Sequence, residues 1–151
     1  ATVARTYRKA IDDYLKSPEL YRENMEWYKS EIGKCTYREF TTGFYFHKPD
    51  ATTQIYDSNT YVKNYTYLGT VEAVREDGLV RIEQKNKFSV GETVEIMKPD
   101  GRNLEKEVAA ICDEEGNPVE SAPHPKQVLY VDLGADAECG DIIRRSEMEA
   151  D

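Results

Sequence analysis

Between Tyr67 and Lys98, apolar and polar residues alternate in three short runs, and this pattern most constrains the fold. Alternation with a period of two is typical of half-buried strands. Asp77-Gly78, between the first two runs, predicts a type I′ hairpin turn, in which both central residues have positive φ. The apolar pairs that share a face within each run are Val71 and Ala73, Val80 and Ile82, and Val94 and Ile96. We therefore expect three strands, of which the first two pair as a hairpin.

A glycine followed by an acid precedes two of the apolar runs. Gly91-Glu92 lies before the third run, and Gly140-Asp141 lies before a later one. Glycine allows turns that are closed to residues with a Cβ, and the acid can accept hydrogen bonds from free amides of a neighbouring loop. We assign both pairs a structural role, with two ordinary turn glycines as the alternative. The repeat predicts a small β-barrel of two related halves, and it resembles the second domain of elongation factor Tu.

Apolar residues at helical spacing occupy the first part of the chain. One stripe is formed by Val3, Tyr7, Ala10, Ile11, Tyr14 and Leu15, and a second by Tyr21, Met25, Tyr28 and Ile32. Ser17-Pro18 separates the stripes, because proline ends a helix but suits the first turn of a new helix that serine caps. Gly33 follows as a C-terminal stop. We expect a helical hairpin whose stripes are packing faces, with a natural partner outside this chain.

These elements define four segments. They are a helical hairpin over residues 1–34, an aromatic-rich extended segment over 35–66, a β-barrel over 67–146 and a tail over 147–151. Later strands are expected at Leu104–Ile111, Val128–Leu133 and Asp141–Arg145. The fold class is mainly β: a small closed six- or seven-stranded β-barrel preceded by an N-terminal α-helical hairpin. The chain lacks an initial Met and opens almost inside a helix, so we interpret it as a fragment of a longer protein.

Charge is distributed unevenly along the chain. The net charge is −9, and residues 1–40 carry eight Lys and Arg against seven Asp and Glu, whereas residues 66–151 carry ten against twenty. The acidic barrel would repel phosphate backbones, which disfavours it as a general nucleic-acid binder. Mean hydropathy is −0.73. No apolar run approaches the roughly 18 residues of a membrane span, so we expect no membrane partner. Three widely spaced cysteines favour reduced thiols in a cytoplasmic protein.

Residues 37–67 hold nine of the sixteen aromatic side chains. The nine are Tyr37, Phe40, Phe44, Tyr45, Phe46, Tyr56, Tyr61, Tyr65 and Tyr67. Such rings could stack on nucleic-acid bases or on the proline rings of a peptide. They could equally belong to an extended segment that wraps the barrel and buries its rings, and this structural interpretation is the favoured one.

The search for a catalytic centre gives no candidate. The two histidines, His47 and His124, have no metal-ligand spacing, so we expect no metal. The sequence holds no nucleophile elbow, phosphate-binding loop or dinucleotide fingerprint, and we expect no cofactor. We assign no catalytic residues.

Four motifs together resemble the carboxy-terminal region of the collagenase-like peptidases, peptidase family U32. They are Arg38-Glu-Phe-Thr-Thr42-Gly-Phe44-Tyr-Phe46, Tyr67-Leu-Gly-Thr, Asn86-Lys-Phe-Ser-Val-Gly91-Glu92-Thr-Val-Glu-Ile96 and Cys139-Gly-Asp-Ile-Ile-Arg144-Arg. The opening helix resembles the segment that follows that family's catalytic barrel, and the likeness covers nearly the whole chain. The resemblance implies an accessory β-barrel, with catalysis in a missing N-terminal domain joined in cis. It also implies a parent protein that is a protease of collagen or gelatin, although some relatives are linked to hydroxylation of ribosomal or transfer RNA.

Our leading hypothesis is an accessory, non-catalytic domain that helps to bind or position substrate, so that the isolated chain is not an enzyme. The candidate substrate-binding residues are Arg38, Thr42, Phe44, Tyr45, Phe46 and His47, and the expected substrate is a collagen- or gelatin-like protein or peptide. One alternative makes the chain itself part of a peptidase, with a thiol or paired acids as catalyst. Another makes it an RNA-contacting module near Arg38, Lys48 and Lys63, which the acidic barrel disfavours.

Overall fold

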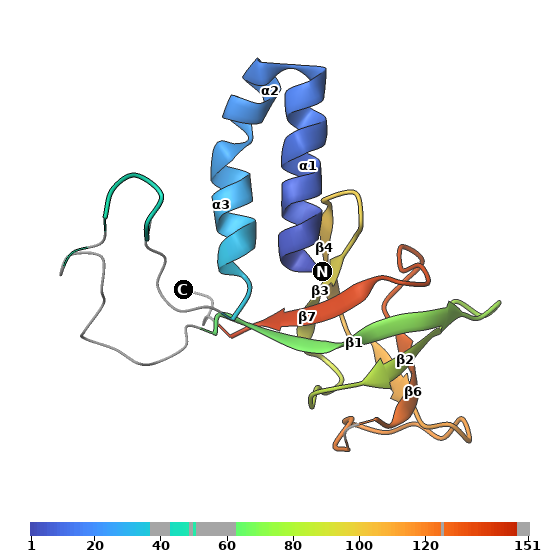
Figure 1. Cartoon of the computed structure of the whole chain (residues 1–151). Coiled ribbons are helices and arrows are strands. Elements are labelled where there is room, and N and C mark those ends of the chain that lie inside the picture. Colours follow the sequence, from blue (N-terminus) through green and yellow to red (C-terminus); the bar gives the residue numbers. More distant parts are fainter. Residues whose placement is uncertain (37–42, 49, 51–62, 125, 148–151) are drawn as a thin grey trace. The chain divides into compact units, whose positions relative to one another are not determined.

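The structure, a computed structural model, describes residues 1–36, 43–48, 50, 63–124 and 126–147. The chain divides into two compact units, Ala1–Asn64 and Tyr65–Asp151, which we call the helical unit and the sheet unit. Helices lie in the first and β-strands in the second (Figure 1). No helix in the described ranges is long and apolar enough to cross a bilayer.

The helical unit contains a helical hairpin, as expected. Its described helices are α1 (Thr2–Lys16), α2 (Pro18–Glu23) and α3 (Met25–Gly33). α1 and α3 run side by side, with α2 at the bend between them (Figure 1). The Ser17 hydroxyl accepts a hydrogen bond from the Leu20 amide at 3.0 Å, and Pro18 opens α2. Ser17 and Pro18 therefore start this helix as their types predict.

The predicted second helix is interrupted at Asn24, which separates α2 from α3. The Asn24 side-chain amide donates a hydrogen bond to a carboxylate oxygen of Asp13, on α1, at 3.0 Å. Asparagine favours such side-chain hydrogen bonds over continued helix, which accounts for the break.

Polar side chains join the helices of the hairpin. Asp13 is 2% exposed and accepts hydrogen bonds from Lys9 and Tyr28 at 2.8 Å each, besides the one from Asn24. Burial alone would raise the pKa of Asp13, but the hydrogen bonds from Lys9, Tyr28 and Asn24 outweigh it and lower the pKa below its ordinary value of 3.8. A buried ion pair between Arg5 and Glu31 links α1 to α3.

The sheet unit is one antiparallel sheet of seven strands in the order β4-β3-β7-β1-β2-β6-β5. The strands are β1 (Tyr65–Val74), β2 (Val80–Gln84), β3 (Thr93–Met97), β4 (Asn103–Glu107), β5 (Ala110–Cys112), β6 (Val128–Asp132) and β7 (Ile142–Ser146). This confirms the mainly β fold preceded by helices. The sheet is curled into a half-barrel. It is not closed, as the predicted barrel was, because its edge strands β4 and β5 form no ladder with each other among the described residues. β1 begins at Tyr65, two residues before the predicted start.

Two residues, Val108 and Ala109, separate β4 from β5, where one continuous strand was predicted. Val108 is fully buried, and its amide and carbonyl bond to Glu92 and Gly91 at 2.9 Å each. Because the backbone of Val108 bonds to the turn before β3, it cannot continue the β4 ladder. β4 therefore ends before Val108, and β5 begins after Ala109.

The core of the sheet unit is apolar and lies on one face of the strands. Its members are Leu68, Val71, Val80, Ile82, Phe88, Val94, Ile96, Val108, Ile111, Ala122, Leu129, Val131, Leu133, Ala137 and Ile143. The predicted inward pairs of β2 and β3 are all buried, and so is Val71 in β1. Ala73 is exposed, contrary to expectation, because the β1–β2 register shifts between Val71 and Ala73. A bulge of this kind reverses which face the following residues occupy.

The β1–β2 turn differs from the predicted type I′ turn. Only Gly78 has positive φ, at 87°, and Asp77 does not. The Gly78 amide donates to the Arg75 carbonyl at 3.0 Å, and the Arg75 amide donates to the Leu79 carbonyl at 2.9 Å. This is the three-residue hairpin in which a left-handed glycine follows an ordinary turn.

We predict that Gly69→Ala destabilises the sheet unit by about 1–3 kcal/mol, because there is no room for a methyl group. A Cβ on Gly69 would lie 2.6 Å from Ile82 Cγ2 and 2.7 Å from the Glu83 carbonyl oxygen. Gly33→Ala is the matched control, since nothing lies within 4 Å of its Cβ position. Urea unfolding should show a lower midpoint for Gly69→Ala alone, and equal midpoints would contradict close strand packing at this position.

We predict that Asp13→Asn weakens the dependence of stability on acid pH. Because the folded-state pKa lies below 3.8, the ionised Asp13 stabilises the fold fully above about pH 5, and this contribution is lost as pH falls through the folded-state pKa. Melting temperatures followed by circular dichroism should therefore fall less on acidification in Asp13→Asn than in the unmodified chain. Asp12→Asn is the control, because Asp12 belongs to an exposed ion pair with Arg8. The same pH dependence in all three proteins would refute this role of Asp13.

Candidate functional site

Residues 43–48 form a surface turn, which we call the aromatic turn, and it contains four of the six predicted substrate-binding residues. The side chains of Phe44, Tyr45 and Phe46 are 83%, 86% and 76% exposed. Tyr45 and Phe46 meet edge to face, with ring centroids 5.4 Å apart and an interplanar angle of 70°. The preceding Gly43 has φ of 50°, which favours glycine at the start of the turn.

His47 is exposed beside these rings, and its Nδ1 lies 3.0 Å from the Lys48 carbonyl oxygen. Because a carbonyl only accepts, this contact requires a proton on Nδ1 and leaves Nε2 available as an acceptor in the neutral ring. The structure therefore brings Phe44, Tyr45, Phe46 and His47 together. Arg38 and Thr42 lie outside the described residues.

The aromatic turn suits binding better than covalent chemistry. Three exposed rings offer faces and edges for stacking on planar or apolar groups. The thiol of Cys139 contacts the Glu72 carbonyl oxygen at 3.0 Å, so it is turned to backbone. Cys35, Cys112 and Cys139 are free thiols. Among the described residues, no group of three or more His, Cys, Asp and Glu could hold a metal ion.

The two Gly-acid pairs adopt matching backbone arrangements. The Gly91 amide donates to the Val108 carbonyl at 2.9 Å, and the Val108 amide donates back to the Glu92 carbonyl at 2.9 Å. The Gly140 amide donates to the carbonyl of Val71 at 2.8 Å, and the amide of Val71 donates back to Asp141 at 2.9 Å. The glycines have φ of 82° and 93°, so both use the left-handed region. Each pair thus holds a buried valine of another strand or loop through its backbone.

The acid of each pair also binds a cation from the other of two halves of the sheet unit. The first half holds β3 with Glu92 and Lys98, and the second holds β7 with Asp141 and Arg145. Asp141 precedes β7 and binds Lys98, which follows β3, at 2.7 Å. Glu92 precedes β3 and binds Arg145, in β7, at 2.6 Å. Because β3 and β7 are paired neighbours, the two ion pairs tie the two halves to each other reciprocally.

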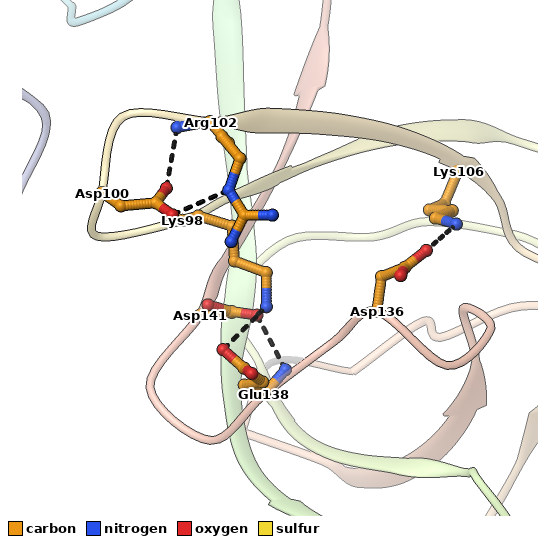
Figure 2. A network of polar contacts seen from close by, with 7 residues as sticks. All are labelled: Lys98, Asp100, Arg102, Lys106, Asp136, Glu138 and Asp141. Carbon is orange, nitrogen blue, oxygen red and sulfur yellow. Dashed lines mark hydrogen bonds and ion pairs between the residues drawn. The ribbon is translucent and has the colours of Figure 1, made fainter.

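Figure 2 shows the Lys98 side chain directed at Asp141 and Glu138. The Lys98 and Asp141 side chains are only 3% and 2% exposed, and Asp141 also accepts from the Glu138 amide at 2.7 Å. Burial alone would lower the pKa of Lys98, but the hydrogen bonds that its ammonium donates to Asp141 and Glu138 outweigh it and raise the pKa. We interpret this buried, satisfied pair as a structural element.

Sequence reasoning missed the cations of these pairs, Lys98 and Arg145. It also missed the buried ion pair between Arg144, in β7, and Glu95, in β3. The Arg144 guanidinium lies 5.0 Å from the ring centroid of Tyr65 in β1. The available signal was the position of each cation relative to a strand that a Gly-acid pair precedes, since Lys98 directly follows β3 and Arg145 lies in β7.

The fold defines this chain as a helical segment followed by a curled antiparallel β domain. Residues 63–144 match the Peptidase family U32 C-terminal domain, and residues 1–55 match Peptidase family U32. The chain therefore belongs to peptidase family U32, as its motifs indicated.

Relatives in this family carry a different functional name. The chain is 34% identical to tRNA hydroxylation protein P1 of Bacillus subtilis over 88% of this chain and 32% of that protein. It is 27% identical to tRNA hydroxylation protein P of Escherichia coli over 91% of this chain and 30% of that protein. The chain thus spans about a third of the length of these curated relatives. A crystal structure of the U32 C-terminal domain from Geobacillus thermoleovorans is 26% identical and has a TM-score of 0.49, covering 54% of this chain and 92% of that one.

We predict that Lys98→Met destabilises the sheet unit by about 3–5 kcal/mol, because it leaves the Asp141 carboxylate buried without its cation. Lys106→Met is the matched control, since the Lys106 ion pair with Asp136 is partly exposed (Figure 2), and it should cost at most about 1 kcal/mol. Adding Asp141→Asn to Lys98→Met should recover part of the loss. The measurement is the urea unfolding midpoint. Equal losses in the two single variants would show that the buried pair is no more important than the surface pair.

Proposed function

We propose that this chain is the accessory region of a tRNA-hydroxylating protein and that its aromatic turn contacts the RNA. The observation that carries this proposal is the 34% identity, over 88% of the chain, to a protein named for tRNA hydroxylation. The chain spans 32% of that relative, so we assign the chemical step to the part of the protein outside this chain. The role of this chain is then to bind and position substrate.

The distribution of charge supports contact through the helical unit rather than the sheet unit. Residues 66–151 carry twenty acids against ten basic residues, and such a surface repels phosphates. The preceding residues carry nine acids and ten basic residues, so this barrier is absent there. Lys48, the last residue of the aromatic turn, and Lys63 are exposed and supply positive charge.

The exposed rings of the aromatic turn match the chemistry of single-stranded RNA. Unstacked bases of loops bind proteins by stacking on aromatic side chains, which needs rings whose faces or edges are open to solvent. Phe44, Tyr45 and Phe46 meet this requirement, since each is more than three-quarters exposed. The neighbouring His47 adds a hydrogen-bonding group.

A peptide substrate is the second candidate, because the family description names a peptidase. The same three rings would then pack against proline rings of a gelatin-like chain. In this alternative the chain still acts as an accessory domain, or it forms part of the peptidase itself with one of its thiols as the nucleophile. Replacement of all three cysteines by serine would abolish cleavage only in that last case.

We predict that Tyr45→Ala with Phe46→Ala weakens binding of the chain to unmodified tRNA by about tenfold or more, since stacking contributes about 1–3 kcal/mol per base. The matched control exchanges the rings, as Tyr45→Phe with Phe46→Tyr, which keeps both stacking surfaces. Fluorescence anisotropy against labelled tRNA at several salt concentrations provides the measurement, with a proline-rich gelatin peptide as competitor.

Binding should weaken with added salt, as expected for contacts to phosphates. In the complete gene product, the alanine variant should also hydroxylate tRNA more slowly, while the ring-exchange variant should not. Retention of tRNA binding by the alanine variant would overturn the assignment of the aromatic turn. Binding of the gelatin peptide instead of tRNA would favour the peptide alternative.

A further inference from the structure

Helix α1 has an inverted distribution of polar and apolar side chains. Its buried residues are Arg5, Thr6 and Asp13, all of them polar or charged. Its large apolar residues are exposed by 47% to 75% of their surface: Val3, Tyr7, Ile11, Tyr14 and Leu15. An amphipathic helix in a folded protein normally covers its apolar stripe. The helical hairpin as described leaves this stripe uncovered.

The apolar stripe of α1 also borders a groove. Tyr7, Ala10, Ile11, Tyr14 and Leu15 line it together with Tyr21 of α2, and its volume is about 390 Å³. Tyr14 and Tyr21 meet edge to face, with centroids 5.7 Å apart, so one wall of the groove is formed by two packed rings. No charged residue lines the groove, so its chemistry suits an apolar surface.

We propose that this groove is the docking surface for the preceding U32 domain of the same polypeptide, through an apolar segment of that domain. Residues 1–55 match Peptidase family U32 itself, whereas the C-terminal domain match begins only at residue 63. The helical unit, which ends at Asn64, therefore carries the match to the main family rather than to its C-terminal domain. The curated relatives are about three times as long as the matched region, which leaves ample chain to supply the occupant.

The proposal is independent of the substrate, so it can be tested without RNA or peptide. Leu15→Cys places a thiol at the groove, and Lys16→Cys places one at the adjacent exposed position on the polar side of α1. The native Cys139 is exposed and serves as an internal reference for labelling by a maleimide. The labelling rate of each position is read by mass spectrometry in the 151-residue chain and in the complete gene product.

We expect labelling at position 15 to be fast in the 151-residue chain and at least about tenfold slower in the complete protein, because thiol reactivity follows exposure. Labelling at position 16 should have the same rate in both. Tyr7→Cys, at the other end of the groove, should repeat the result and guards against a local effect of one substitution.

Unchanged labelling at positions 15 and 7 in the complete protein would overturn the proposal. Protection already present in the 151-residue chain would overturn it as well, because the occupant would then come from this chain. In that case, loss of protection on dilution would identify a second copy, and protection at all concentrations would identify the sheet unit.

Discussion

The sheet unit depends on the turn that leads into β7, where backbone and side-chain bonds converge on Asp141. Its backbone holds Val71 of β1, while its carboxylate holds Lys98 at the end of β3. β7 lies between β1 and β3 in the sheet, so one turn secures three neighbouring strands. Removing a lysine and a carboxylate from water is costly, and the cost is offset only by a short ion pair with further hydrogen bonds. The bonds to Glu138 supply those further contacts.

The same arrangement explains how the two halves of the sheet unit are related. Glu92 repeats the role of Asp141 at the turn before β3, with Val108 in place of Val71 and Arg145 in place of Lys98. The two pairs differ in burial, since Arg145 and Glu92 keep 27% and 31% of their side chains exposed. The buried member therefore carries the larger penalty if it is broken, and the exposed member tolerates change.

Local patterns in the sequence predicted the elements whose partners are close along the chain. Ser17 and Pro18 start a helix through bonds within a few residues, and the alternating residues of β2 and β3 point inward as their period requires. Elements that depend on distant partners could not be predicted in this way. Asn24 breaks a helix because Asp13 lies across the hairpin. The strand predicted over Leu104–Ile111 is broken between β4 and β5 because Val108 bonds to the turn at Gly91.

Predictions about which aromatic and apolar residues are buried had the same limit. The composition of residues 37–67 allowed either a buried wrapping segment or an exposed platform, and the structure shows exposure for Phe44, Tyr45 and Phe46. A spacing pattern identifies the faces of an element but does not say which face meets a neighbour. Four motifs still identified the family correctly, and two of them hold the Gly-acid pairs at strand entry, which the fold requires wherever the rings lie.

Helix α1 is amphipathic, and its stability depends on which of its two faces is packed. Its contacts to α3 use a buried ion pair and the hydrogen bonds of Asp13, and buried polar contacts of this kind contribute little net free energy after desolvation. Short helices in water gain most of their stability from packing an apolar face. In α1 that face is the exposed stripe, where burial would contribute about 1 kcal/mol or more for each large side chain. Polar contacts within the hairpin therefore set its geometry, and the apolar stripe holds most of the free energy that α1 can still gain from a partner.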